Sequence, residues 1–221
     1  MPRPIKLQRK MQKNTFTYKI GTSLYINLTN KCPNACVFCI RDLSAGVGGY
    51  NLWLEREPTA DEVIAEIEAV ISSNANGVTT NKPTVSTINE IVFCGYGEPT
   101  YRLAEIAKIA AFCRSKNLLT RLNTNGLGSL INGRDISKEV AACIHTVSVS
   151  LNAPSAERYR QLCKSEFGTA AFDALIEFGK RCLEHGAEVV FTVVDALTQT
   201  ETAQCRKIAE NLGAKFRVRH L

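Results

Sequence analysis

Three closely spaced cysteines are the residues of this chain with the clearest chemistry. Cys32, Cys36 and Cys39 follow the apolar run 23–28 in a Cys-x3-Cys-x2-Cys pattern. Three thiolates from one loop suit three irons of a [4Fe–4S] cluster. A complete cage normally takes four cysteines, and no fourth cysteine is near in the sequence. One iron would therefore stay open to a small chelating ligand.

Two other uses of these cysteines compete with an iron–sulfur cluster. Zinc would need a distant histidine as its fourth ligand, and it would leave the apolar run and the later motifs unexplained. A disulfide framework fits less well, because the chain of 221 residues has nine cysteines, an odd number, and we recognise no signal peptide. We favour the cluster. We expect most of the remaining cysteines to be buried as small apolar side chains: Cys94, Cys113, Cys143, Cys163, Cys182 and Cys205.

Six apolar runs alternate with longer amphipathic stretches. The runs are rich in Val, Ile and Phe, as buried parallel strands are, and they cover residues 23–28, 90–94, 118–123, 146–151, 188–194 and 215–219. The stretches between them repeat apolar residues at helical spacing: 60–73, 103–116, 137–144, 170–185 and 201–212. This order predicts a parallel α/β fold. Eight units would close a TIM barrel, so six predict an open (β/α)6 partial barrel.

The segments that follow these strands contain polar and glycine residues. Residues 94–99 read Cys-Gly-Tyr-Gly-Glu-Pro, and residues 123–126 read Asn-Thr-Asn-Gly. Ligands of parallel α/β folds collect at the carboxyl ends of strands. Glycines let the backbone approach a ligand closely, and the Glu98 carboxylate suits an ammonium group. An ordinary strand-to-helix turn is the alternative for 94–99, and Asn125-Gly126 is also a common turn pair.

The fourth strand carries polar residues at alternate positions. Ser148, Ser150 and Asn152 alternate with Val147, Val149 and Leu151, and this period of two puts the polar set on one face of the strand. If that face points into the barrel, Ser150 and Asn152 reach the rim. A solvent-facing strand is the alternative.

Three further positions have open interpretations. Arg217 and Arg219 share one face of the last strand, where an inward arginine would anchor a carboxylate or phosphate. We favour an exposed terminal edge for them. Cys94 suits a fourth ligand, a hydrogen donor or a packed strand residue, and we favour packing.

Charge and composition favour one soluble domain. The chain is 45% hydrophobic and has a formal net charge of +6. Residues 1–14 contain five of the basic residues and no acid, so we expect a disordered basic tail there and a single domain over 15–221. Binding of nucleic acid by this tail is only weakly indicated. No apolar run approaches the ~20 residues of a membrane helix. We therefore expect a cytoplasmic protein that does not enter a membrane.

The sequence resembles the radical S-adenosylmethionine (radical SAM) superfamily. The likeness rests on the Cys triad with Phe38 before its last cysteine, on the Gly-x-Gly-Glu-Pro segment and on the six α/β units. It implies that the open iron binds SAM, that the reduced cluster cleaves SAM, and that the 5′-deoxyadenosyl radical abstracts hydrogen from a substrate. It also implies roles for site residues. Gly95, Tyr96, Gly97 and Glu98 would receive the SAM amino group, with Tyr96 replacing the glycine that is usual in the family. Ser150, Asn152 and Asn123 would hold the ribose or methionine carboxylate, and Phe38 would cover the adenine.

Finer likenesses concern the subgroup and the substrate. Segments 25–42, 50–58 and 93–100 resemble the TatD-linked radical SAM proteins. The compact architecture is similar to activating enzymes that act on a partner protein, which implies a flavodoxin- or ferredoxin-type reductant. We expect a large substrate, a protein, peptide or nucleic-acid component, with Tyr50 and Trp53 of the long connection 41–58 at its entrance. Burial of Trp53 in the core is the alternative. The alternative functions are a SAM-independent iron–sulfur electron carrier or sensor, and a zinc-holding nucleic-acid module.

Overall fold

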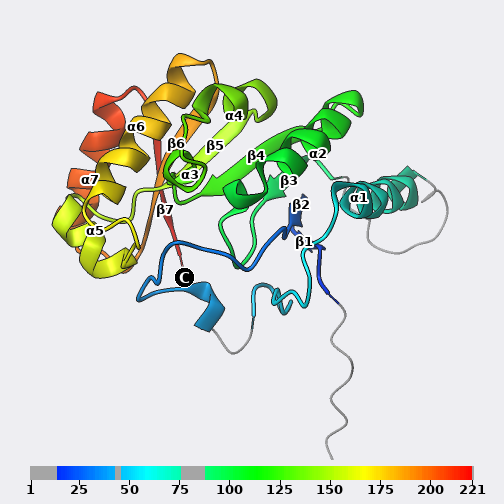
Figure 1. Cartoon of the computed structure of the whole chain (residues 1–221), viewed down its shortest axis with the longest axis horizontal. Helices are drawn as coiled ribbons and strands as arrows, with labels where there is room; N and C mark the ends of the chain where they lie inside the picture. The colour runs from blue at the N-terminus through cyan, green and yellow to red at the C-terminus, as the bar shows by residue number, and fades with distance from the viewer. Residues whose placement is uncertain (1–13, 43–45, 76–87, 221) are drawn as a thin grey trace, which may run out of the picture.

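Seven strands form one curved sheet, in which each strand pairs with the next one along the chain (Figure 1). The computed structural model describes residues 14–42, 46–75 and 88–220. Strands β2 to β7 run parallel, and β1 is antiparallel to β2. Within the described residues β7 does not pair with β1, so the barrel is open, as predicted. The strands are β1 (Thr17–Ile20), β2 (Ser23–Ile26), β3 (Glu90–Phe93), β4 (Leu119–Thr124), β5 (Thr146–Ser150), β6 (Glu188–Val194) and β7 (Lys215–Arg219).

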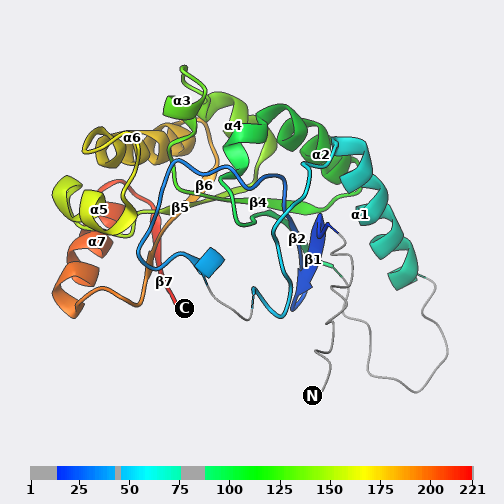
Figure 2. The same cartoon turned by 60° about the horizontal axis from the view of Figure 1, so that its bottom comes forward.

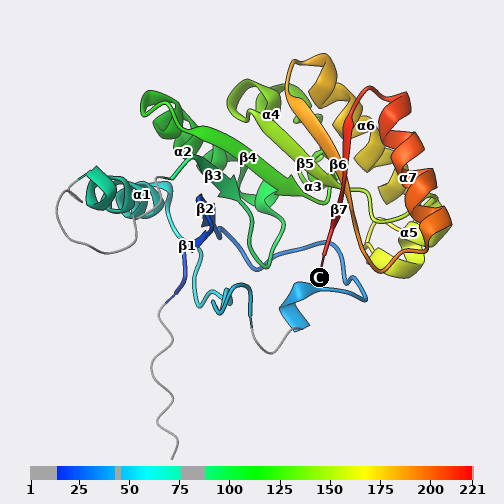
Figure 3. The same cartoon turned by 180° about the vertical axis from the view of Figure 1, so that it is seen from behind.

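Helices cover the convex side of the sheet and leave the other side to loops (Figure 2). The α-helices are α1 (Ala60–Ala75), α2 (Leu103–Ser115), α3 (Gly128–Ile131), α4 (Ser137–Cys143), α5 (Ala156–Cys163), α6 (Ala170–Glu184) and α7 (Gln199–Asn211). Two short 3-10 helices are η1 (Ile40–Asp42) and η2 (Pro99–Arg102). Seen from behind, β7 and α7 lie at one end of the molecule and β1 with α1 at the other (Figure 3).

The six predicted strands are present, and the structure adds β1. This strand was missed because Thr-Tyr-Lys-Ile is short and half polar, and because only Gly21 and Thr22 separate it from β2. It forms an antiparallel hairpin whose register joins Tyr18 to Tyr25. The basic tail lies outside the described residues apart from Asn14. The polar residue types of 72–83 suit an exposed loop, but residues 72–75 belong to α1, and 76–83 also lie outside the described residues.

The register of the sheet separates an apolar face from a polar face. Ile26, Phe93, Leu122, Val147 and Val189 follow one another across five strands and are buried against the helices. Side chains alternate between the faces of a sheet, so the residues between them point into the half-barrel. Those positions include polar side chains at Arg121, Asn123, Ser148, Ser150, Thr192 and Arg219.

A second, smaller apolar cluster covers the hairpin edge. Tyr18, Leu52 and Tyr96 are buried together, and Tyr18 stacks on Tyr25 with ring centroids 5.1 Å apart. Asn27 Nδ2 donates to the Leu52 carbonyl at 2.7 Å and fixes the long connection against β2. The connection therefore closes this edge of the sheet. Burial of Trp53 in the core was the wrong alternative, since its exposed fraction is 45%.

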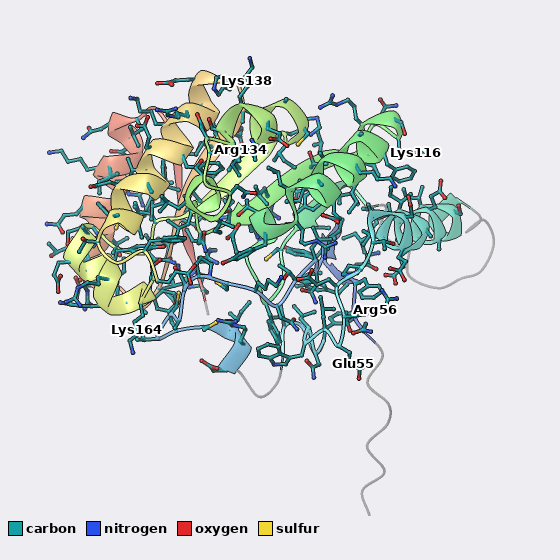
Figure 4. All side chains as sticks on the ribbon, viewed as in Figure 1. Glu55, Arg56, Lys116, Arg134, Lys138 and Lys164 are labelled. Carbon is teal, nitrogen blue, oxygen red and sulfur yellow. The ribbon has the colours of Figure 1, made fainter. Side chains whose placement is uncertain are left out.

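Charged side chains surround the outer helices. Lys116, Arg134 and Lys138 project from the region of α2 and α4, and Arg56 and Lys164 lie on the opposite side (Figure 4). Arg56 pairs with Glu62 at the start of α1 and lies over the Phe16 ring at 5.1 Å. Such exposed pairs each contribute little, about 0–1 kcal/mol. None of the helices in the described ranges is long and apolar enough to span a membrane.

Candidate active site

A pocket with a cavity volume of about 160 Å³ lies at the carboxyl ends of the parallel strands. The loop after β2, which we call the Cys loop (residues 29–39), forms one wall, and the ends of β3, β4, β5 and β7 form the others. Most residues predicted for the site line this pocket: Cys32, Cys36, Cys39, Phe38, Gly95, Gly97, Glu98, Asn123, Ser150 and Asn152.

Backbone hydrogen bonds attach the Cys loop to the end of α5. Ala35 N donates to the Cys163 carbonyl at 3.0 Å, and Val37 N donates to the Leu162 carbonyl at 2.9 Å. These contacts hold the three site cysteines half-buried and facing one pocket. The sequence did not indicate this role for α5, because the contacts are made by main-chain groups that leave no signature in residue type.

Arg41 is a site residue that the sequence analysis missed. Its Nε donates to Cys39 Sγ at 3.3 Å, and its Nη2 donates to the Asn34 carbonyl at 3.2 Å. Its guanidinium also lies 5.9 Å from the centroid of the Trp53 ring. Arg41 therefore supplies a positive charge to the Cys39 sulfur and joins the Cys loop to the long connection. Its position two residues after Cys39 was the only available signal.

The three thiols of the Cys loop do not gather as the ligands of one ion in the described structure. In the described part of the chain, no three side chains of His, Cys, Asp or Glu gather around a point that would suit one ion. A [4Fe–4S] cluster needs a different arrangement, since each thiolate binds its own iron. Burial raises the pKa of Cys32 to about 11, while a hydrogen bond with Cys163 lowers the pKa of Cys36. Metal binding releases such thiol protons.

Gly95 and Gly97 allow the segment after β3 to lie against the Cys loop. A Cβ at Gly95 would lie 2.0 Å from Asn27 Oδ1, and one at Gly97 would lie 2.3 Å from the Thr29 carbonyl oxygen. Real Cβ contacts are never this short, so only glycine fits at either position. Glu98 N then donates to the Lys31 carbonyl at 2.8 Å. The glycines are thus required by loop packing as well as by access to the pocket.

Tyr96 does not line the pocket. Its side chain is buried in the cluster with Tyr18 and Leu52 and meets Trp53 edge-on, with ring centroids 5.2 Å apart. The side chain thus points away from the site, which explains how this position accepts a residue larger than glycine. Only the backbone of Tyr96 remains available for the predicted ligand contact.

The Glu98 carboxylate is buried and holds two rim segments together. Oε1 accepts hydrogen bonds from Thr100 N at 3.2 Å, Thr100 Oγ1 at 2.8 Å and Thr124 Oγ1 at 2.8 Å. Oε2 accepts one from Asn125 N at 2.7 Å. Burial raises the pKa of Glu98, and these four donors oppose that rise. Glu98 thereby fixes the end of β4 relative to the end of β3.

Several buried side-chain oxygens in the pocket have no hydrogen-bond partner within the described residues. They are the side-chain oxygens of Asn34, Asn123 and Asn152. An unsatisfied buried acceptor costs about 1–3 kcal/mol, so the site is built for a ligand with donor groups. Asn152 also has a positive φ of 53°, a conformation that asparagine tolerates better than most residues. Asn125 makes a turn with Gly126 and also lines the pocket, so the turn does not exclude a contact with a ligand.

Two favoured expectations from the sequence were wrong. Arg219 is not at an exposed edge: it lines the pocket, and its Nη2 donates to Ser150 Oγ at 3.3 Å. Arg217 is exposed, as expected. Cys94 also lines the pocket, although we favoured simple packing. The direction of the side chains explains both errors. Each residue lies on the strand face that points into the half-barrel, and the rim of the half-barrel is polar. Cys113, Cys163, Cys182 and Cys205 are buried, as predicted.

The residues present suit a [4Fe–4S] cluster with a polar ligand beside it. Three thiols face one pocket, and the unpartnered amide oxygens lie in the same lining. Cys32, Cys36 and Cys39 would hold the cluster, which would supply one-electron chemistry. The fold and the site together define an iron–sulfur enzyme built on an open (β/α)6 barrel.

The comparisons with known proteins agree with that class. The family model of the radical SAM superfamily matches residues 26–207 of this chain. A search of curated proteins found no match. This chain belongs to the radical SAM superfamily, a family of enzymes that use a [4Fe–4S] cluster and SAM.

Similar folds occur among solved structures. SuiB from Streptococcus suis bound to the precursor peptide SuiA is 19% identical with a TM-score of 0.65, and the match covers 90% of this chain and 39% of SuiB. A radical SAM methyltransferase from Sphaerobacter thermophilus is 17% identical with a TM-score of 0.62, covering 90% and 66%. Native anSMEcpe with bound AdoMet is 18% identical with a TM-score of 0.60, covering 89% and 50%. This chain therefore corresponds to only part of each of these proteins.

Replacing any one of Cys32, Cys36 or Cys39 by Ala is expected to abolish the intact cluster. Anaerobically reconstituted wild-type protein should contain roughly four irons per chain, and each variant should fall well below that value. Cys113→Ala and Cys205→Ala are the controls, since both side chains are buried away from the pocket. Iron and zinc analysis, together with the absorption spectrum, measures the result. Wild-type protein that takes up zinc and no iron would contradict the assignment.

Proposed function

We propose that this chain binds SAM in the described pocket and uses the 5′-deoxyadenosyl radical to abstract hydrogen from a large substrate. The observation that carries the proposal is the meeting of three thiols and several unpartnered amides in one pocket. SAM offers an amino group and ribose hydroxyls as donors, and these match acceptors that the protein leaves unsatisfied. When bound, the cluster supplies the electron that cleaves SAM.

The residues of the chain bind and orient the nucleotide. We assign the SAM amino group to the backbone of Gly95–Glu98, and the ribose or methionine carboxylate to Asn123, Ser150 and Asn152. Phe38 lines the pocket and is packed against the core, which suits a cover for the adenine. Glu98 acts chiefly by holding the rim in place, because its oxygens already accept four hydrogen bonds.

An open sheet and an exposed aromatic side chain support a large substrate. The sheet does not close, and the long connection ends beside the Cys loop with Trp53 half exposed. Tyr50 is also exposed, at 37%. Neither side chain lines the pocket, but the Trp53 ring lies 5.9 Å from the guanidinium of Arg41, which donates to Cys39 Sγ. Exposed aromatic residues this close to a site suit packing against a partner. We therefore propose a protein, a peptide or a nucleic-acid component as the substrate. SuiB bound to its precursor peptide provides one example of this fold with a peptide.

The subgroup and the reductant are part of the same proposal. We propose a TatD-linked radical SAM protein, on the resemblance of segments 25–42, 50–58 and 93–100. We also propose a flavodoxin- or ferredoxin-type reductant, on the resemblance to the compact activating enzymes. The rival function is a SAM-independent electron carrier or sensor. Formation of 5′-deoxyadenosine by reduced, reconstituted protein in the presence of SAM separates the two, because the rival forms none.

Asn152→Gly is expected to weaken SAM binding at least tenfold while the cluster is retained. Glycine keeps the positive φ of this residue and removes only the amide, so the change tests the ligand contact without backbone strain. Asn117→Gly is a matched control, because Asn117 has a φ of 55° at the far end of α2. Equilibrium binding of SAM to the anaerobic holoenzyme measures the effect. Equal SAM affinity in both variants would place the nucleotide elsewhere.

Glu98→Gln is expected to destabilise the protein by about 1–3 kcal/mol and to lower SAM affinity. The amide has one acceptor oxygen where the carboxylate has two, so at least one buried donor loses its partner. Glu139→Gln, a change to an exposed residue paired with Arg134, is the control. Chemical denaturation and SAM binding are measured in parallel. A Glu98→Gln variant as stable as wild type would show that the rim does not depend on this carboxylate.

Trp53→Ala should leave the cluster and uncoupled SAM cleavage in place and weaken substrate binding. The lost edge contact with Tyr96 is worth about 0.5–1.5 kcal/mol, which the fold tolerates. Leu52→Ala is the structural comparison: Leu52 is fully buried, and its truncation should cost about 2–5 kcal/mol. Iron content, 5′-deoxyadenosine formation and unfolding are measured for both. Loss of the cluster in Trp53→Ala would assign Trp53 a structural role instead.

A further inference from the structure

The last strand places an uncompensated positive charge in the pocket. Lys215, Arg217 and Arg219 share the inward face of β7, because Phe216 and Val218 pack against the helix side. Lys215 pairs with Glu188 of β6, and elsewhere in the sheet Arg121 of β4 pairs with Glu90 of β3 at 2.9 Å. Neither Arg217 nor Arg219 forms an ion pair with any residue that the structure describes.

Arg219 differs from Arg217 in its surroundings. Its guanidinium lines the pocket and donates from Nη2 to Ser150 Oγ at 3.3 Å, while its Nε is buried with no acceptor. Burial lowers the pKa of Arg219; the thiols of Cys94 and Cys36 oppose this effect, and the like charge of Arg217 adds to it. Asp195, which follows β6, contacts His220 Nδ1 at 2.9 Å. Arg219 as a whole is half-buried. A partly buried cation with no acidic side chain beside it is costly to the fold, so we expect the balancing anion from a ligand.

The geometry points to a subsite for a carboxylate group of the substrate, bound by the Arg219 guanidinium. This inference rests on the proposed function, because it places the substrate above β7 in the pocket that holds SAM. The guanidinium offers parallel N–H donors that match the two oxygens of a carboxylate, and the Nε donor is still free. The substrate is therefore an acidic molecule, and for a peptide it would present an Asp, a Glu or a carboxyl terminus.

A carboxylate fits this site better than a phosphate. One partly buried positive charge balances one negative charge. A phosphate dianion would keep a second negative charge among neutral amides and thiols, where desolvation is costly. Arg217 does not remedy this, because it is exposed to water.

Small probes test the subsite in the anaerobic holoenzyme with SAM bound. Butyrate, its uncharged analogue butyramide and inorganic phosphate are titrated by calorimetry into wild type, Arg219→Gln and Arg219→Lys. Wild type should bind butyrate in preference to both other probes. Arg219→Gln should lose at least about tenfold in butyrate affinity, equivalent to roughly 1.4 kcal/mol, and Arg219→Lys should lose less. Arg206→Gln is the matched control, because Arg206 lies over Phe216 on the helix side of the same strand at 4.7 Å.

Three results would overturn the subsite. They are no butyrate binding by wild type, tighter binding of phosphate than of butyrate, or a loss of SAM affinity in Arg219→Gln that exceeds its loss of butyrate affinity. The last result would assign Arg219 to the carboxylate of SAM itself. Failure of the proposed function is separately visible. Wild-type protein that binds butyrate through Arg219 but forms no 5′-deoxyadenosine keeps the subsite and loses the radical mechanism.

Discussion

The arrangement of the site depends on the close contact between the Cys loop and the segment after β3. Two glycines permit this contact, since a Cβ at Gly97 would overlap the carbonyls of Thr29 and Lys31. Glu98 N then donates to Lys31, and the Glu98 carboxylate fixes the end of β4 through Thr124 and Asn125. One side chain thus relates two strand ends that carry ligand-binding groups. Because the carboxylate is buried, each of its hydrogen bonds is costly to lose, and the rim is correspondingly rigid.

Much of the fold and part of the site could be predicted because the spacing of apolar and polar residues along the chain indicates them. The six parallel strands are apolar runs, and the carboxyl ends of such strands meet at one rim. That rule alone brings Cys32, Glu98 and Asn152 together from distant parts of the chain. The alternation in β5 also predicted correctly which of its residues line the pocket. These inferences succeed for two reasons. The alternation of side chains along a strand is a local property of the sequence, and the meeting of strand ends at one rim is general to parallel sheets.

The features that the sequence analysis missed depend on where side chains point in the folded protein. The sequence suggested that Arg219 is an exposed polar residue at the end of the last strand. Its side chain points into the half-barrel because Phe216 and Val218, on the other face of β7, pack against the helices. Tyr96 appeared within a ligand motif, but the hairpin formed by β1 offers its ring an apolar site outside the pocket. That site was unknown without β1, a four-residue strand with little hydrophobic signal. The direction of the Tyr96 side chain therefore could not be predicted from the sequence, because it depends on one short edge strand.

The two arginines of the site, Arg41 and Arg219, have different roles. Arg41 is anchored by two loop carbonyls and by Trp53, so its charge is committed to the Cys39 sulfur and to the shape of the Cys loop. Arg219 is held by one long hydrogen bond to Ser150 and keeps a buried donor unused. A group that has satisfied its donors within the protein stabilises structure, and one that has not is available to a ligand. On this physical distinction, Arg41 belongs to the scaffold that holds the thiols, and Arg219 belongs to the surface that recognises what enters the barrel.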